Sequence, residues 1–250
     1  MDGAGRLSLN NEEIKEVSDA DMRESRGERK PGRRDTRHRD PFGRLPVSAR
    51  GAIERGVPMS RNGGAGERAR VGIPRALMYY RYYPFLKALL EGFGCEAVSS
   101  PPTNLRIMGM GTDLCVDDVC VAVKALFGHV RHLEGKVDAI LIPRLVSVEK
   151  KDYDTFTCPK LIAAPDMVRF SFPHLPPPLE FVVDVKRVPF WWGCMRLGRC
   201  LKVPPHRIMR SYAAAAREQE RFEALQRGGL LPADALERLG NGKDTAPPSY

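Results

Sequence analysis

Long apolar runs are missing from this 250-residue sequence, whose mean hydropathy is −0.34. Without an uninterrupted apolar stretch of roughly 18 residues, a transmembrane helix is not expected. The first residues, MDGAGRLSLNNEEIKEV, lack the apolar segment of a secretory signal, so we expect a cytoplasmic protein. Six cysteines are too few for a disulfide scaffold, and clustered thiols in the cytosol indicate metal or redox chemistry more often than bridges.

Common catalytic motifs are absent as well. The sequence has no P-loop lysine motif, which argues against ATP hydrolysis by this chain, and no Gly-x-Ser-x-Gly elbow. Gly109 and Gly111 lie between two predicted helices and lack the third glycine of a dinucleotide loop. No Cys-x2-Cys pair occurs, and His129 and His132 lie toward the far end of their predicted helix, which disfavours zinc.

The net charge of +9 is concentrated at the two ends of the chain. Residues 1–70 contain 16 Lys and Arg against 12 Asp and Glu, and residues 191–250 contain 10 against 6. Residues 71–190 are nearly neutral, with 14 against 13. Because nucleic-acid binding normally needs a basic face on the folded part, nucleic acid is not the expected partner.

The first 69 residues mix charge, glycine and proline with few large apolar side chains, which predicts a disordered, basic and Gly-rich leader. A basic RNA-binding tail over residues 29–44 is an alternative interpretation. A third is that translation begins at Met59, so that residues 1–58 are not part of the protein. Residues 241–250 are also predicted to be disordered.

The middle of the chain alternates between strands and helices. Strands are predicted at 71–74, 95–100 and 137–142. Helices are predicted at 76–94, from a Thr103 or Asn104 cap to Met110, from Asp117, and from Pro159 to about 167. This order predicts an open α/β domain with a parallel sheet over residues 70–190. A polar loop is expected at 143–157, and a helical tail over 191–240 is expected to pack on the domain through Trp191 and Trp192.

Three cysteines are predicted to lie near the edge of the sheet where ligands usually bind, beyond the carboxyl ends of the strands. Cys115 and Cys120 flank the start of the Asp117 helix, with Cys120 in its first turn, and Cys158 caps the helix that begins at Pro159. Thiolates at helix N-termini are stabilised by the helix dipole and by free N–H groups. This pattern suggests metal binding, although small buried cysteines would produce it equally well.

Basic side chains are expected at the same edge of the sheet. They would hold CoA phosphates or balance an anionic cluster, and the alternative is that water simply solvates them. The set comprises Arg75, Arg144, Lys150, Lys151 and Lys160.

Four ordered motifs, VGIPRALMYYRYYPF, SSPPTN, VDDVCVAVKALFGHV and DAILIPRLVSVEKKDYDTFTCPKLIAAPDM, resemble the acyl-CoA dehydratase activase-related family. That family is often labelled CoA protein activase or 2-hydroxyglutaryl-CoA dehydratase-like. The resemblance implies a flavodoxin-like domain that binds a [4Fe-4S] cluster, and a separate ATP-hydrolysing activase that delivers single electrons at low potential. Cys120 and Cys158 match the family's cysteines, whereas Cys115 falls where a small apolar residue is usual.

The cluster-carrying relatives have two such domains and this chain has one, so the resemblance implies that a second cluster-carrying subunit completes the site. Three hypotheses follow. The chain is an iron–sulfur component of a 2-hydroxyacyl-CoA dehydratase-like system, with acyl-CoA as substrate. Alternatively, it is a non-enzymatic scaffold or regulator of that system, or a metal-free α/β module that binds CoA or a nucleotide.

Overall fold

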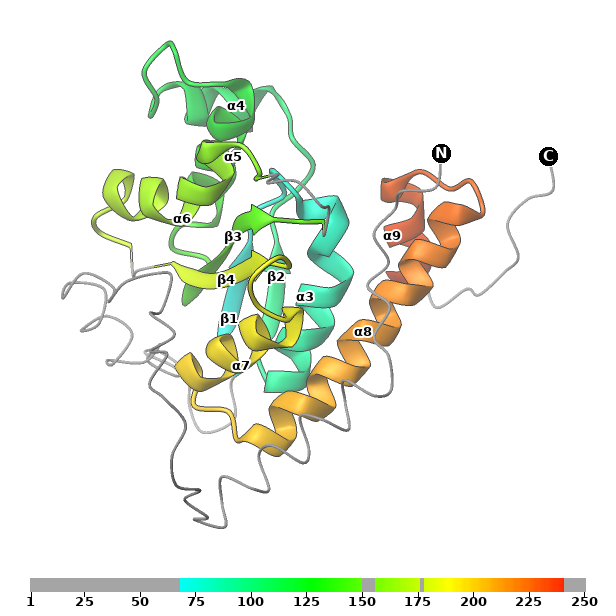
Figure 1. Ribbon diagram of the computed structural model, residues 1–250. Coiled ribbons are helices and arrows are strands. Elements are labelled where there is room, and N and C mark those ends of the chain that lie inside the picture. Colours follow the sequence, from blue (N-terminus) through cyan, green and yellow to red (C-terminus); the bar gives the residue numbers. More distant parts are fainter. Residues whose placement is uncertain (1–67, 150–155, 176–177, 241–250) are drawn as a thin grey trace. The chain divides into compact units, whose positions relative to one another are not determined.

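The computed structural model describes residues 68–149, 156–175 and 178–240 of the protein (Figure 1). The predicted leader up to residue 67, Lys150, Lys151 and the predicted disordered residues 241–250 lie outside these ranges. Within them, no helix is long and apolar enough to cross a lipid bilayer.

Four parallel strands form one sheet in the order β2-β1-β3-β4. The strands are β1 (Arg70–Ile73), β2 (Glu96–Ser99), β3 (Ala139–Ser147) and β4 (Leu179–Asp184). From β1, one connection runs outward to β2 and the next strand is added on the opposite side as β3. The order in which strands are added to the sheet therefore reverses at β1. In open α/β sheets, ligands usually bind at such a reversal, here between β1 and β3. The predicted flavodoxin-like class is confirmed.

Two features of the sheet differ from the prediction. β3 continues to Ser147, although a polar loop was expected from Pro143. The strand pairs with β1 only at Ala139 and Ile140, and beyond them no described strand lies on that side, so a proline is tolerated. β4 was not predicted at all, because its six residues follow a proline run and are too few to show a clear period.

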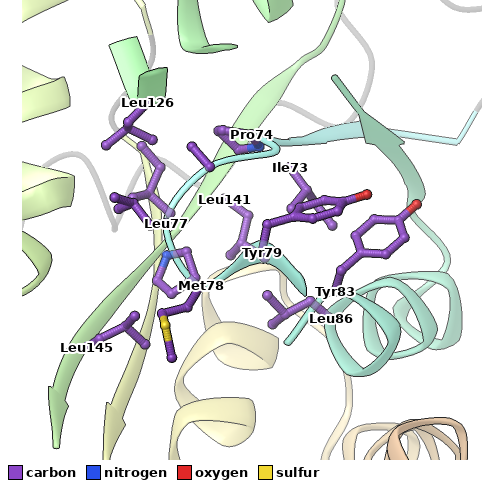
Figure 2. Close-up of a pocket in the computed structure, with 13 residues that line it drawn as sticks. Ile73, Pro74, Leu77, Met78, Tyr79, Tyr83, Leu86, Leu126, Leu141 and Leu145 are labelled. Carbon is purple, nitrogen blue, oxygen red and sulfur yellow. The ribbon is translucent and has the colours of Figure 1, made fainter. Parts of the chain in front are cut away.

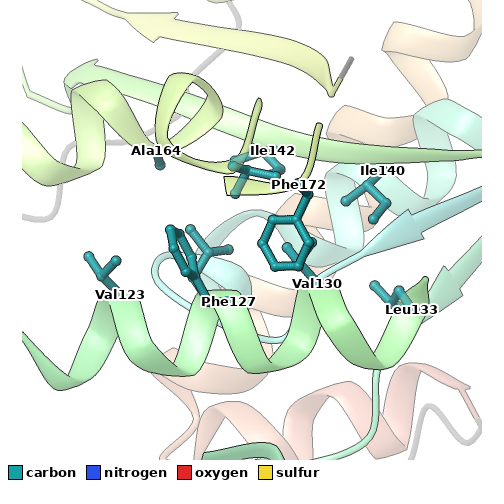
Figure 3. Close-up of a cluster of buried hydrophobic side chains, with 10 residues drawn as sticks. Val123, Phe127, Val130, Leu133, Ile140, Ile142, Ala164 and Phe172 are labelled. Carbon is teal, nitrogen blue, oxygen red and sulfur yellow. The ribbon is translucent and has the colours of Figure 1, made fainter. Parts of the chain in front are cut away.

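Two helices, α5 (Val121–Leu133) and α6 (Pro159–Ser171), cover one face of the sheet, and α4 (Leu105–Thr112) packs on α5. Figure 3 shows the side chains of α5 pointing toward β3 and α6. The buried cluster on this face consists of Val123, Leu126, Phe127, Val130, Leu133, Ile140, Ile142, Ala164, Val168 and Phe172. The buried residues of α5 thus recur at helical spacing and face this cluster.

The other face is covered by α3 (Tyr79–Phe93), α7 (Phe190–Cys200) and α8 (Pro205–Arg227), and α9 (Pro232–Gly240) packs on α8. An aromatic cluster joins α3, β4, α7 and α8, with ring centroids between 5.0 and 6.1 Å apart; its members are Phe85, Phe181, Phe190 and Tyr212. The long helix α8 lies against α3, and the Gln219 side chain donates to the Arg81 carbonyl at 2.9 Å. The helical C-terminal part is thus confirmed.

Candidate functional site

Cys120 and Cys158 are the N-cap residues of α5 and α6, and both are exposed. The position of Cys158 agrees with the prediction. Cys120 was expected in the first turn of a helix beginning at Asp117, but α5 begins only at Val121, where N–H groups first donate to the Cys120 carbonyl. The aspartates at 117 and 118 therefore lie in the preceding turn. Neither thiol forms a capping hydrogen bond of ordinary geometry, so both remain free for a ligand.

The surroundings of Cys120 favour its thiolate. Its pKa is lowered, first by the backbone N–H of Val123 at the open end of α5 and then by the Lys160 ammonium, with the N–H of Ala122 adding to both. Lys160 lies in the first turn of α6, two residues after Cys158. The Cys120 sulfur thus lies at the N-terminus of α5 and is reached from α6 by the Lys160 side chain.

The remaining cysteines differ from this pair. Cys95 and Cys194 are buried, and burial raises the pKa of both thiols. Cys115 is half-buried, and its pKa is raised by burial and further by the nearby Cys120 thiol. Among the described residues, no three His, Cys, Asp or Glu side chains come close enough together to hold a metal ion. Cys120 and Cys158 are thus exposed thiols, and the described residues form no closed metal site.

Cys120 is expected to be the first thiol alkylated by iodoacetamide at pH 7.5, because the lowered pKa and the exposure act together. Replacement of Lys160 by glutamine should raise the pKa of Cys120 and slow its alkylation several-fold, whereas Lys87→Gln on α3 should not. Mass spectrometry of timed samples measures both rates. Equal rates in the two variants would show that Lys160 does not act on the thiol.

Two glycines fix the position of α5 relative to α4. A Cβ at Gly111 would lie 1.8 Å from the Lys124 carbonyl oxygen, and one at Gly128 would lie 2.0 Å from the Ile107 carbonyl oxygen. The backbones of the two helices therefore touch at two points, in opposite chain directions. This contact fixes the position of the turn that follows α4 and carries Cys115 and Cys120.

The Arg144 guanidinium is held by carboxylate and carbonyl partners. Its guanidinium donates to the carboxylates of Asp166 (2.8 Å) and Glu180 (3.2 Å) and to the Ile162 carbonyl (2.7 Å). Arg169 bonds to the same two carboxylates, which closes a ring of four charges between β3, β4 and α6. A role for Arg144 in holding CoA remains a prediction, and it would require this ring to open.

Arg75 lies two residues after the end of β1, near the carboxyl ends of the strands. Its guanidinium lies over the rings of Tyr79 and Tyr80, at 5.5 and 5.2 Å from their centroids, and donates to the Tyr80 hydroxyl at 3.0 Å. It forms no ion pair with a carboxylate in the described part of the chain. Among the described members of the predicted basic set, Arg75 and Lys160 are thus not ion-paired, unlike Arg144.

An apolar pocket opens where β1 ends and β3 continues past it (Figure 2). Its cavity volume is about 20 Å³, room for about one water molecule. The segment between β1 and α3 forms one wall, and Leu77 in that segment adopts a left-handed backbone with φ of 56°. Such a conformation is strained for leucine and is concentrated at functional loops. The pocket lies at the reversal point of the sheet, with Arg75 on the segment that borders it.

A buried histidine was missed by sequence reasoning. His129 on α5 is fully buried, with Nδ1 hydrogen-bonded to the Ser100 hydroxyl at 2.9 Å and Nε2 to the Thr103 hydroxyl at 3.0 Å. The Ser100 hydroxyl also accepts from the Arg75 backbone N–H at 2.8 Å. The histidine therefore ties α5 to the loops after β1 and β2. No local pattern reveals this role, because its partners lie almost 30 residues earlier.

Acid should weaken the fold through His129. Burial, with smaller contributions from His132 and Arg75, lowers the pKa of His129 from 6.5 to about 4. Between these values the unfolded chain binds a proton that the folded protein does not, so the free energy of unfolding falls as the pH drops from 6.5 to 4. We expect this group to account for a loss of about 3 kcal/mol.

Urea titrations at pH 7 and pH 4 measure that loss. The His129→Gln variant keeps a side chain that can hydrogen-bond but does not titrate, so its stability should fall about 3 kcal/mol less than that of the wild type over the same interval. Equal losses in both proteins would contradict the buried neutral histidine.

The fold and the two cysteines define a class: a parallel α/β domain with exposed cysteines at the N-termini of two helices. The family model described as "CoA enzyme activase uncharacterised domain (DUF2229)" matches residues 70–243. The chain belongs to this family, which supports the acyl-CoA dehydratase activase-related resemblance. No curated protein and no solved structure matches the chain.

Proposed function

We propose that this protein is an iron–sulfur component of a 2-hydroxyacyl-CoA dehydratase-like system in the cytoplasm. The observation that carries the proposal is that Cys120 and Cys158 are exposed N-cap residues of two neighbouring helices, and that Lys160 in the first turn of α6 acts on the Cys120 thiol. The membership in a CoA enzyme activase family supports the same kind of system.

The donor set suits such a cluster. Iron–sulfur clusters are held by cysteine thiolates and are anionic, and here two helix N-termini and one ammonium offset that charge. Cys120 and Cys158 would bind iron, and Cys115 would be a weaker ligand because its thiol is half-buried. When bound, the cluster would supply single-electron transfer at low potential. An ATP-hydrolysing activase is the proposed electron donor, and a second cluster-carrying subunit is the proposed companion.

Anaerobic purification with iron and sulfide analysis tests the proposal. We expect a brown protein with near-equal iron and acid-labile sulfide, and a loss of at least nine-tenths of both in Cys120→Ser and Cys158→Ser. Cys200→Ser should retain them, because Cys200 lies on α7 and is half-buried. A colourless chain, both alone and co-expressed with an activase and a dehydratase subunit, would refute the proposal.

The pocket at the sheet reversal favours a second function, binding of CoA or a related thioester without metal. The apolar walls suit an acyl group once the pocket, about 20 Å³ in this structure, widens, and Arg75 suits a phosphate or a carbonyl oxygen. CoA at millimolar concentration should raise the melting temperature of the wild type and not that of Arg75→Gln. Arg144 is a poor choice for this test, because its removal breaks the charge ring whether or not CoA binds.

A further inference from the structure

A groove opens between the C-terminal end of α3 and the start of α8, which lie side by side (Figure 1). Helix α3 ends at Phe93, three residues before β2 begins, so the groove lies at the amino edge of the sheet. Its cavity volume of about 400 Å³ is within the range of small-molecule sites. We call it the α8 groove, and its lining residues are Gly92, His206, Arg207, Arg210, Ser211 and Ala214. None of them lines the apolar pocket beside β1.

The side chains that line the α8 groove are basic or small. His206, Arg207 and Arg210 are exposed, and Arg210 lies one helical turn beyond the other two, so all three project from one side of α8. Among the described residues, the side chains of His206 and Arg210 form neither a hydrogen bond nor an ion pair. No described aspartate or glutamate lines the groove. The groove is therefore a concave surface of positive charge.

Arg207 is held in place by the backbone of α3. Its Nε donates to the Gly92 carbonyl at 2.9 Å, which uses one of the five N–H groups of the guanidinium. A Cβ at Gly94 would lie 2.9 Å from Nη2 of Arg207, so the guanidinium rests against bare backbone. A Cβ at Gly92 would lie 2.5 Å from the Ser211 Oγ, because α3 and α8 approach closely beneath the groove. Arg207 is thus preorganised, and no described residue occupies its Nη groups.

The groove lies within a long stretch of chain that carries charge of one sign. Residues 185–217 contain eight Lys and Arg and no Asp or Glu, and they include all of α7 and the first half of α8. From Arg196 to Arg210, no lysine or arginine forms an ion pair with a described residue. Part of the positive charge near the C-terminal end of the sequence is therefore on the folded domain. The summed field of these charges attracts anions to the groove.

The start of α8 adds positive charge and nothing that offsets it. The N-cap residue Pro204 offers no side-chain hydrogen bond, and the first turn contains no acidic residue. The free N–H groups of a helix N-terminus carry a partial positive charge, so a cation there is destabilising unless an anion is bound. Capping of α3 accounts for Arg207 but leaves His206 and Arg210 without a described partner. A bound anion would offset all of these charges.

We propose that the α8 groove binds a small phosphate monoester. Near neutral pH the phosphate of such a ligand carries close to two negative charges, which match the guanidinium groups of Arg207 and Arg210. The volume of the groove leaves room for the organic part of the ligand beside the phosphate. A concave groove favours this ligand over a nucleic-acid strand, which needs an extended basic face. The inference goes beyond the proposed function and is independent of it, because the groove contains none of the cysteines.

Isothermal titration calorimetry of the full chain with AMP, in buffer free of phosphate and sulfate, tests the proposal. We expect one AMP to bind per chain and inorganic phosphate at millimolar concentration to displace it. Cyclic AMP keeps the same base and sugar but has a singly charged diester, so it should bind at least about tenfold more weakly. Adenosine, which has no phosphate, should not bind.

Two arginines of α8 provide the variant and its matched control. Arg210→Gln should weaken AMP binding at least about tenfold, because it removes a charged donor that no described residue uses. Arg217→Gln removes the same charge from the same helix outside the groove, and it should change the affinity less than about threefold. Circular dichroism should show that both variants are folded, because neither arginine has a described partner.

Three results would overturn the proposal. The first is an Arg210→Gln protein that binds AMP as tightly as the wild type, which would place the phosphate elsewhere. The second is failure of both AMP and inorganic phosphate to bind at millimolar concentration. The third is a single-stranded oligonucleotide that binds more tightly than AMP, with an affinity that rises with its length, which would identify a nucleic-acid surface instead. None of these results bears on the iron–sulfur proposal.

Discussion

Replacing Gly111 by alanine is expected to lower the free energy of unfolding by about 3 kcal/mol or more. The new Cβ would lie 1.8 Å from the Lys124 carbonyl oxygen and 2.9 Å from the Gly128 nitrogen, and both atoms belong to the backbone of α5. A clash with backbone cannot be relieved by a side-chain rotation, so the two helices must move apart. The clash outweighs the gain of about 1 kcal/mol that alanine brings to a helix.

Gly109 provides the matched control, because it lies on the same helix and a Cβ there would meet no atom within 4 Å. Gly109→Ala should therefore stabilise the protein by up to about 1 kcal/mol. Urea unfolding followed by circular dichroism measures both changes. If the two substitutions had the same effect, the close approach of α4 and α5 would be wrong.

The Gly111 variant also tests whether the helix pair positions the thiols. Separation of α4 from α5 moves the turn that carries Cys115 and Cys120 away from Lys160. The alkylation of Cys120 should then slow toward the rate seen in Lys160→Gln. Gly109→Ala should leave that rate unchanged.

Replacing Arg144 by leucine is expected to lower the free energy of unfolding by about 2 to 4 kcal/mol. Arg144 and Glu180 are only 15% and 11% exposed, so the substitution leaves a nearly buried carboxylate with Arg169 as its remaining partner. Asp166 is better hydrated, at 39% exposed, and contributes less to the loss. An exposed pair such as Arg221–Glu218 should cost less than about 1 kcal/mol when it is broken.

A second substitution identifies the cause of the loss. Adding Glu180→Gln to Arg144→Leu removes the uncompensated charge and should restore part of the stability. A double variant that is as unstable as the sum of the single ones would show that the two residues act independently. Arg221→Leu is the control for loss of a guanidinium from the surface.

The general architecture could be predicted because periodicity and turn residues are local signals. The helix cap at Cys158 was predicted correctly because Pro159 marks the first helical position. Asp117 and Asp118 are residue types that commonly begin a helix. The sequence therefore predicted Cys120 inside the helix rather than at its N-cap. The predicted strand ended too early because a proline and an arginine usually end a strand. In the structure, Pro143 lies where β3 pairs with no described strand on the β1 side, and Arg144 is ion-paired with Glu180.

The remaining parts of the site depend on contacts between distant residues. The hydrogen bonds of His129, the charge ring of Arg144 and the close approach at Gly111 each join residues that are 13 to 36 positions apart. No periodicity encodes such pairs. The sequence correctly placed Cys158 at a helix cap and Arg75 after the first strand, but the partners of the individual side chains required the structure.

The packing of α8 against α3 has a consequence for the synthesis of the protein on the ribosome. The core on the α5 side is complete in sequence once Phe172 has been made, but the apolar side of α3 is covered by helices that are translated later. The bond between Arg81 and Gln219 spans 138 residues. A nascent chain therefore exposes Phe85 and its neighbours until α8 emerges, and during that interval it is a substrate for chaperones that bind apolar segments.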